Sequence, residues 1–192
     1  MGSRGHGRAR RLISRSDDPE VMKTTLYCLV LLGALGAFDT LYYHEWRLRL
    51  PSTPAAASEL RLHGVRDFAY TIVFATLAWT TWNGFWVWPL AAILLFEVWA
   101  TLADFLEEDR TRRLPAGERV MHAIMGIVYG AFLATLYPYA ARWATLHSGF
   151  GPADYGVVSW ILTLYAAGVF TSGLRDLSAS RKLTRTAQRL PA

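Results

Sequence analysis

Five long apolar runs constrain this chain more than any other feature of its sequence. Each run reaches or approaches the roughly 20 residues that an α-helix needs to cross the hydrocarbon core of a bilayer. The runs are 24–46, 65–82, 86–106, 120–143 and 155–174. Because 53% of the 192 residues are hydrophobic, the sequence predicts an all-α integral membrane bundle of five transmembrane helices.

The segments that flank these runs are basic. Residues 1–20 are rich in glycine and arginine, and we expect a disordered N-terminal arm, although a signal peptide also fits a basic segment before an apolar run. Residues 21–178 form the predicted membrane domain, and residues 179–192 form a basic C-terminal tail. The formal charge of +5 is spread over loops, which favours anionic lipid over nucleic acid as the partner.

Arginines gather in the loops after the first and third runs and in the C-terminal tail. With five spans these three regions lie on one side of the membrane, and the positive-inside rule places that side in the cytoplasm. The loop at 80–88 on the other side has no charge. The basic N-terminal arm then lies outside, against the same rule. We therefore predict a protein of the bacterial cytoplasmic (inner) membrane, oriented by its more numerous loop arginines.

One pattern occurs twice in the chain. The first copy reads FDTLYYHEWRLRLP over 38–51 and the second reads ADFLEEDRTRRLP over 103–115, so that Asp39 corresponds to Asp104. After each Leu-Pro pair comes a Glu-x-x-x-His motif, ELRLH at 59–63 and ERVMH at 118–122. The first four helices are therefore predicted to form two repeated hairpins, related by a pseudo-two-fold axis along the membrane normal.

Acids and histidines inside membrane spans are costly and usually face the bundle interior or water. Glu and His four residues apart share a helical face, and each pair follows an Asp by a similar distance. We expect six side chains to converge near one membrane surface as metal ligands: Asp39, Glu59, His63, Asp104, Glu118 and His122. The alternative is a set of interfacial ion pairs in which the two glutamates bind loop arginines.

This pattern resembles, in its ligand types alone, the carboxylate proteins that hold two metal ions between four helices, including membrane-embedded di-iron proteins. Here the Glu–His spacing is one residue longer, and two Asp stand in place of two Glu. The resemblance implies a dinuclear centre. Oxygen and imidazole donors without a thiolate ligand favour iron, with zinc or manganese as alternatives.

Two further side chains join the predicted ligand set. Glu97 lies seven residues before Asp104 on the same helical face, about 10 Å deeper, and is predicted to face the metal and act in catalysis. His44 lies five residues after Asp39, a spacing that is off-face in an ideal α-helix, and corresponds to Asp109 in the second copy. Glu108 is cofacial with Asp104 and competes with Asp109 for any role.

These residues lead to one functional hypothesis and three alternatives. The leading hypothesis is a membrane metalloenzyme with a di-iron centre that oxidises, hydroxylates or desaturates a lipid or other apolar substrate. The sequence has no nucleotide or flavin fingerprint, so electrons would come from a partner protein. The alternatives are a zinc-dependent membrane hydrolase, a non-catalytic metal-binding subunit and a haem-binding subunit. Whether the protein forms a homo-oligomer is left open.

Overall fold

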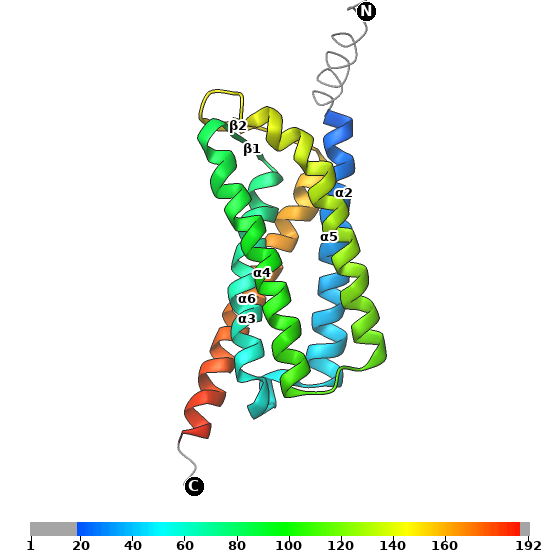
Figure 1. Cartoon of the computed structure of the whole chain (residues 1–192), viewed down its shortest axis with the longest axis vertical. Helices are drawn as coiled ribbons and strands as arrows, with labels where there is room; N and C mark the ends of the chain where they lie inside the picture. Colours follow the sequence, from blue (N-terminus) through cyan, green and yellow to red (C-terminus); the bar gives the residue numbers. More distant parts are fainter. Residues whose placement is uncertain (1–18, 189–192) are drawn as a thin grey trace, which may run out of the picture.

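The computed structural model of the chain describes residues 19–188 and consists mainly of long helices packed side by side (Figure 1). These helices are α2 (Pro19–Phe38), α3 (Ala57–Leu77), α4 (Val87–Thr111), α5 (Ala116–Trp143) and α6 (Val157–Ala187). Apart from the first two residues of α2, the predicted N-terminal arm lies outside the described residues. The predicted C-terminal tail is helical as far as Ala187.

Four helical segments are long and apolar enough to cross a membrane, which confirms a helical membrane bundle. They are Met22–Arg47, Gly84–Thr111, Ala116–Trp143 and Val157–Ala187. The remaining long helix, α3, does not qualify by composition, because Glu59, Arg61, Arg66 and Asp67 lie in its first half. The fifth span therefore stays a prediction.

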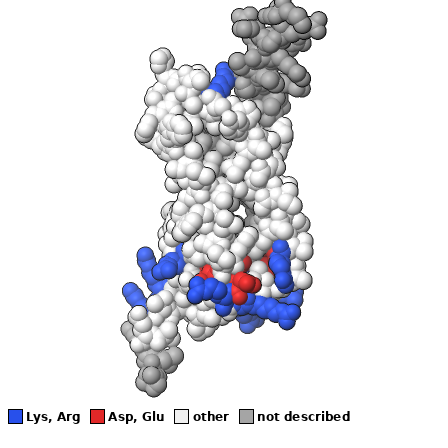
Figure 2. Space-filling model, in the orientation of Figure 1, with Lys and Arg blue, Asp and Glu red and all other residues white. Residues whose placement is uncertain are grey.

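Charged side chains gather at one end of the bundle, where α2 and α4 end and α3 and α5 begin (Figures 1 and 2). The middle of the face seen in Figure 2 carries no lysine, arginine, aspartate or glutamate. Large apolar side chains of the long helices, such as Leu95, Ile127 and Leu164, are about 70% exposed. An uncharged, apolar middle with charges at one end is the surface expected of a protein embedded in lipid.

The first helix changes its geometry at the charged end. Helix α2 runs directly into η1 (Asp39–Arg47), a nine-residue π-helix. The chain then turns through Arg49, whose φ is 51°, and through two short 3-10 helices, η2 (Leu50–Ser52) and η3 (Pro54–Ala56). A proline occupies an early position in both, where its fixed φ is favourable and its missing N–H is not needed.

The opposite end of the bundle has a two-stranded antiparallel ladder. Strand β1 (Thr80–Asn83) pairs with β2 (Gly149–Pro152), with Trp82 opposite Phe150. Gly84 follows β1 with a φ of 59°, a conformation that glycine adopts without strain. The sequence predicted only loops here, so the ladder is an addition to the all-α prediction, made by hydrogen bonds between loops far apart in the chain.

The apolar core fills the bundle between these two ends. Its largest fully buried members are Leu26, Leu29, Phe74, Leu77, Leu90, Phe132, Leu136 and Leu162. Helix α6 crosses α3 closely at Gly64 and Gly173, where a Cβ on either glycine would lie 3.0 Å from the backbone oxygen of the other. Small residues allow such close approach of membrane helices. The crossing holds α6 against the start of α3.

Candidate metal centre

All eight predicted ligands are buried, and most of them meet at the charged end of the bundle. They are Asp39, His44, Glu59, His63, Glu97, Asp104, Glu118 and His122. Two groups of these buried side chains, together with Glu108, could hold a metal ion. Within each group one ligand atom from every residue lies within 4.8 Å of the others.

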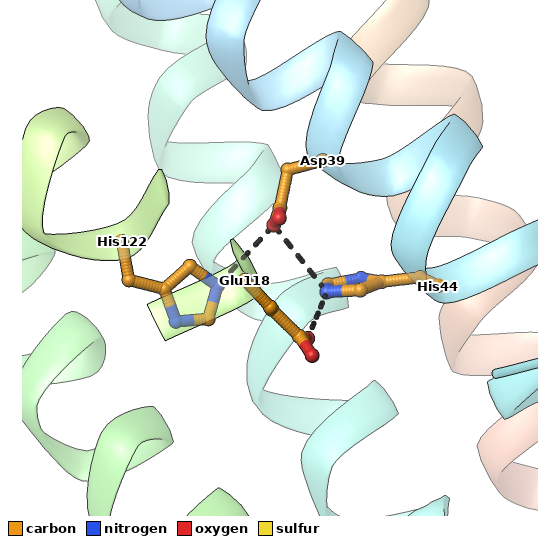
Figure 3. Close-up of side chains that lie close together, drawn as sticks. All are labelled: Asp39, His44, Glu118 and His122. Atoms are coloured by element: carbon orange, nitrogen blue, oxygen red, sulfur yellow. Dashed lines mark hydrogen bonds and ion pairs between the residues drawn. The ribbon is translucent and has the colours of Figure 1, made fainter. Parts of the chain in front are cut away.

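The first group consists of Asp39, His44, Glu118 and His122, which point toward one another from two helices, η1 and α5 (Figure 3). The Nε2 atom of His122 lies 3.3 Å from Oδ2 of Asp39. The Nε2 atom of His44 lies 3.4 Å from the same oxygen and 3.6 Å from Oε1 of Glu118.

These three distances are long for hydrogen bonds from a ring nitrogen, which are usually 2.7–3.2 Å. They match three of the six edges of a coordination tetrahedron, because ligands bound at 2.0–2.2 Å to a zinc-like ion are separated by about 3.3–3.6 Å. Nε2 of His44 and Oδ1 of Asp39 are buried without a hydrogen-bond partner among the described residues. The donor types, their spacing and these atoms without partners fit a metal ion.

The π-helix brings Asp39 and His44 to one side. Its hydrogen bonds join residues five apart, so a pair at that spacing closes one turn. The same pair in an α-helix would be off-face, so α-helical spacing alone did not favour His44 as a ligand beside Asp39. π-Helical turns are frequently found at functional sites. The first group thus depends on a local departure from α-helical geometry.

The second ring nitrogen of His122 fixes its orientation. Nδ1 lies 3.4 Å from Oε2 of Glu108, on the opposite side of the ring from Asp39. The ring also stacks on Phe105, with centroids 5.2 Å apart. A histidine that ligates a metal through one nitrogen commonly directs the other at a carboxylate. His122 therefore has the surroundings of a metal ligand.

The second group consists of His44, Glu59, His63 and Glu108, and it shares His44 with the first. The rings of His44 and His63 are stacked with centroids 4.7 Å apart and planes within 7°. This stacking leaves no room for a porphyrin between the two rings, which argues against a haem held by this pair.

The donors of the second group are largely engaged by other side chains. Nε2 of His63 lies 2.9 Å from Oδ2 of Asp104, which also accepts a 2.8 Å hydrogen bond from Arg66. The carboxylate of Glu59 accepts hydrogen bonds of 2.9–3.3 Å from Arg112. The second group therefore resembles the predicted ion-pair alternative more closely than the first does.

Arg112 lies among three buried glutamates. Its guanidinium donates to Glu118 at 2.7 and 2.9 Å and to Glu108 at 3.1 Å, besides its bonds to Glu59. Burial lowers the pKa of Arg112, but the hydrogen bonds to Glu118 and Glu59 outweigh it and raise the pKa above its ordinary value. Arg112 is therefore a permanent cation that compensates part of the acidic charge.

Two predicted ligands lie outside both groups. Asp104 pairs with His63 and Arg66, as described above. Glu97 is completely buried deeper in the bundle, and neither of its carboxylate oxygens makes a hydrogen bond of good geometry among the described residues. Arg66, Tyr70 and Asp67 interact with it electrostatically.

Sequence reasoning gave too little weight to two residues. Glu108 was named only as a competitor of Asp109, yet Glu108 is buried in the second group, whereas Asp109 is exposed. Arg112 was counted among the loop arginines, although its position one residue after α4 directs it back into the bundle. The four-residue spacing from Asp104 through Glu108 to Arg112 was the signal for both, because it marks one helical face.

Comparison of the chain with family models, with curated proteins and with solved structures finds no match.

Proposed function

We propose that the protein is an integral membrane metalloenzyme that binds one divalent ion between Asp39, His44, Glu118 and His122. The observation that carries this proposal is the set of three donor–donor distances of 3.3, 3.4 and 3.6 Å, which correspond to tetrahedral edges. Two histidines and two carboxylates suit zinc or iron. The tetrahedral spacing favours zinc and a hydrolytic reaction over the oxidation expected from sequence.

The two carboxylates have different freedom to move. Both oxygens of Glu118 accept hydrogen bonds from Arg112, which fixes this side chain in place. Asp39 has one oxygen that makes no hydrogen bond within the described residues. We assign His44, His122 and Glu118 to holding the ion, a two-histidine, one-glutamate set known from zinc hydrolases.

Asp39 then has two functions. It would be the fourth residue to hold the ion, and its carboxylate would accept the proton of the attacking water when substrate enters. The bound ion supplies an activated water near neutral pH. Arg112 keeps Glu118 ionised and oriented throughout. The reaction class is hydrolysis of an ester, amide or similar bond in a lipid or other apolar substrate, which reaches the site through the bilayer.

A dinuclear iron centre is the second candidate, and one observation favours it. The four donors of the second group also converge within 4.8 Å, next to the first. Two observations weigh against it. The groups share a histidine and no bridging carboxylate, and Arg112 would have to release Glu59 before a second ion could bind.

We also propose the two-hairpin repeat, five membrane spans and a cytoplasmic location of the site. Asp39 of η1 contacts His122 of α5, and Asp104 of α4 contacts His63 of α3, as a two-fold exchange of the hairpins requires. The first copy has one residue more between its Asp and its Leu-Pro pair, and the π-helix accommodates that residue. His44 then corresponds to Glu108 instead of Asp109.

The test is the metal content of the purified protein. Wild-type protein extracted in mild detergent should hold about one zinc-type ion per chain, and its cobalt-substituted form should show the visible absorption of tetrahedral cobalt. His122→Ala should lose the ion, because a ligand is removed. The matched control is His147→Ala, which changes an exposed histidine at the other end of the bundle and should keep the ion.

Other outcomes decide among the alternatives. About two irons per chain with weak near-ultraviolet absorption would establish the dinuclear candidate, since that centre needs both groups. An intense Soret band would indicate haem. Wild-type protein that holds no ion and whose stability is unaffected by zinc or chelator would leave only the ion-pair cluster and would reject the proposal.

A further inference from the structure

A second site lies at the charged end of the bundle, away from the side chains of the metal groups. It is a pocket of about 500 Å³ between the start of α3 and the last turns of α6. Its lining consists of Ala57, Ser58, Arg61, Ser180, Arg181, Thr184 and Arg185. None of these residues belongs to either metal group.

Short side chains create the hollow. Ala57 and Ser58 belong to the first turn of α3, and Ser180 faces them from α6. The buried hydroxyl of Ser180 donates a 2.6 Å hydrogen bond to the carbonyl of Ala57, so the polar groups at the floor of the hollow are already hydrogen-bonded to each other. The groups that remain to meet a ligand are those of the longer side chains at the rim.

Three arginines make this rim strongly positive. Arg181 and Arg185 are four residues apart on α6 and therefore share a face, and Arg61 approaches from α3. All three are exposed, and among the described residues none forms an ion pair. No acidic residue lines the pocket. The pocket thus presents uncompensated guanidinium groups around a hollow large enough for a small polar group.

The position of the pocket in the bundle indicates which anion it meets. The apolar part of α6 ends near Leu174, and the polar sequence that follows carries the pocket residues. This level corresponds to the lipid headgroups if the apolar part of α6 spans the membrane. Anionic headgroups are concentrated at such a surface, and basic pockets between membrane helices bind them.

We propose that this pocket binds the phosphate of an anionic membrane lipid, with Arg61, Arg181 and Arg185 as the recognising side chains. Guanidinium groups bind phosphate oxygens through paired hydrogen bonds, which makes arginine well suited to this task. The bound lipid ties α6 to the start of α3 from outside the bundle. This inference does not depend on the metal centre.

The experiment compares two double variants with wild type in lipid nanodiscs. Arg61→Gln/Arg181→Gln removes two pocket charges. Arg110→Gln/Arg113→Gln removes two charges from exposed positions outside the pocket, one in the last turn of α4 and one in the loop after it. Native mass spectrometry measures the phosphatidylglycerol retained by each protein, with phosphatidylcholine discs as the neutral reference.

Wild type and the control variant should retain phosphatidylglycerol over phosphatidylcholine, and the pocket variant should bind it about 10- to 30-fold more weakly. Circular dichroism and metal content should be unchanged in both variants, because neither touches the metal groups.

A second arm adds inorganic phosphate during release from the discs. If phosphate leaves the lipid bound, the headgroup in its bilayer is the ligand, as proposed. If millimolar phosphate displaces the lipid completely, the pocket is a site for free phosphate, and the lipid assignment is overturned. Equal loss of lipid in both double variants would show a general effect of surface charge and would also overturn it.

Discussion

The two metal-ligand groups are built from the same residue types, yet their donors are engaged differently. In the first group the Asp39–His122 contact is 3.3 Å, and within residues 19–188 no arginine binds this aspartate. Beside the second group, Asp104 and His63 form a 2.9 Å contact, and Arg66 also donates a hydrogen bond to this aspartate. Arg66 lies three residues after His63, and the residue three after His122 in the second copy is Met125.

A second arginine enlarges this difference. Arg112 binds every glutamate near the groups, and in the first copy its position is occupied by Leu48. Arg66 belongs to the first copy and Arg112 to the second, and neither has a basic counterpart in the other copy. Arg112 also binds Glu118 of the first group, so the two groups differ chiefly at the other donors. Arg66 and Arg112 take the place of an ion beside the second group, while Asp39 and His44 of the first group keep atoms without a hydrogen-bond partner among the described residues. A repeated ligand pattern can thus yield one metal site and one ion-pair network.

The largest effect is expected from Arg112→Gln. Removing the guanidinium leaves three buried glutamates without their shared cation, and breaking a buried ion pair in this way costs about 3–5 kcal/mol of stability. Added zinc should restore much of this loss and should raise the metal content from about one ion to about two, because the second group is then free.

Thermal unfolding in detergent, with chelator and with zinc, measures both effects. The control is Arg110→Gln, whose side chain is 81% exposed and 4.0 Å from Glu107. The thermal stability of this control and its response to zinc should be close to those of wild type. An Arg112→Gln protein as stable as this control in chelator would contradict the role of Arg112.

A smaller effect is expected from His63→Ala. It removes the hydrogen bond to Asp104, but Arg66 still binds that aspartate, so the cost in stability is about 1–3 kcal/mol. The ion should stay bound, in contrast to His122→Ala. Metal analysis of the two variants side by side tests the asymmetry of the groups. Equal metal loss in both would show that the two groups act as one dinuclear site.

The smallest effect is expected from Glu97→Leu. Leucine at the corresponding position of the first copy, Leu32, packs in the core. Because Glu97 lies outside both groups and is buried, the variant should keep its metal and gain about 1 kcal/mol in stability. Such a result would show that Glu97 does not have the metal-facing role expected from sequence. Loss of the ion in Glu97→Leu would reinstate Glu97 as a ligand.

Much of the candidate site was accessible from the sequence. Charges are so costly inside apolar runs that Asp39, Asp104 and the two Glu-x-x-x-His motifs stood out, and all of them are buried at one end of the bundle. Helical spacing was sufficient to place each motif on one face. Helical spacing did not predict that His44 shares a face with Asp39, because the residues after Asp39 are π-helical and the α-helical period does not apply there.

The sequence by itself determined the helical membrane bundle and the acids and histidines that its charged end would bury, because hydropathy and helical periodicity are local properties of the chain. Only the tertiary structure decided which donors face an ion and which face an arginine. Arg112 meets Glu59 from 53 residues away, and Arg66 meets Asp104 from 38. Such pairings depend on how helices pack, and no local pattern specifies them.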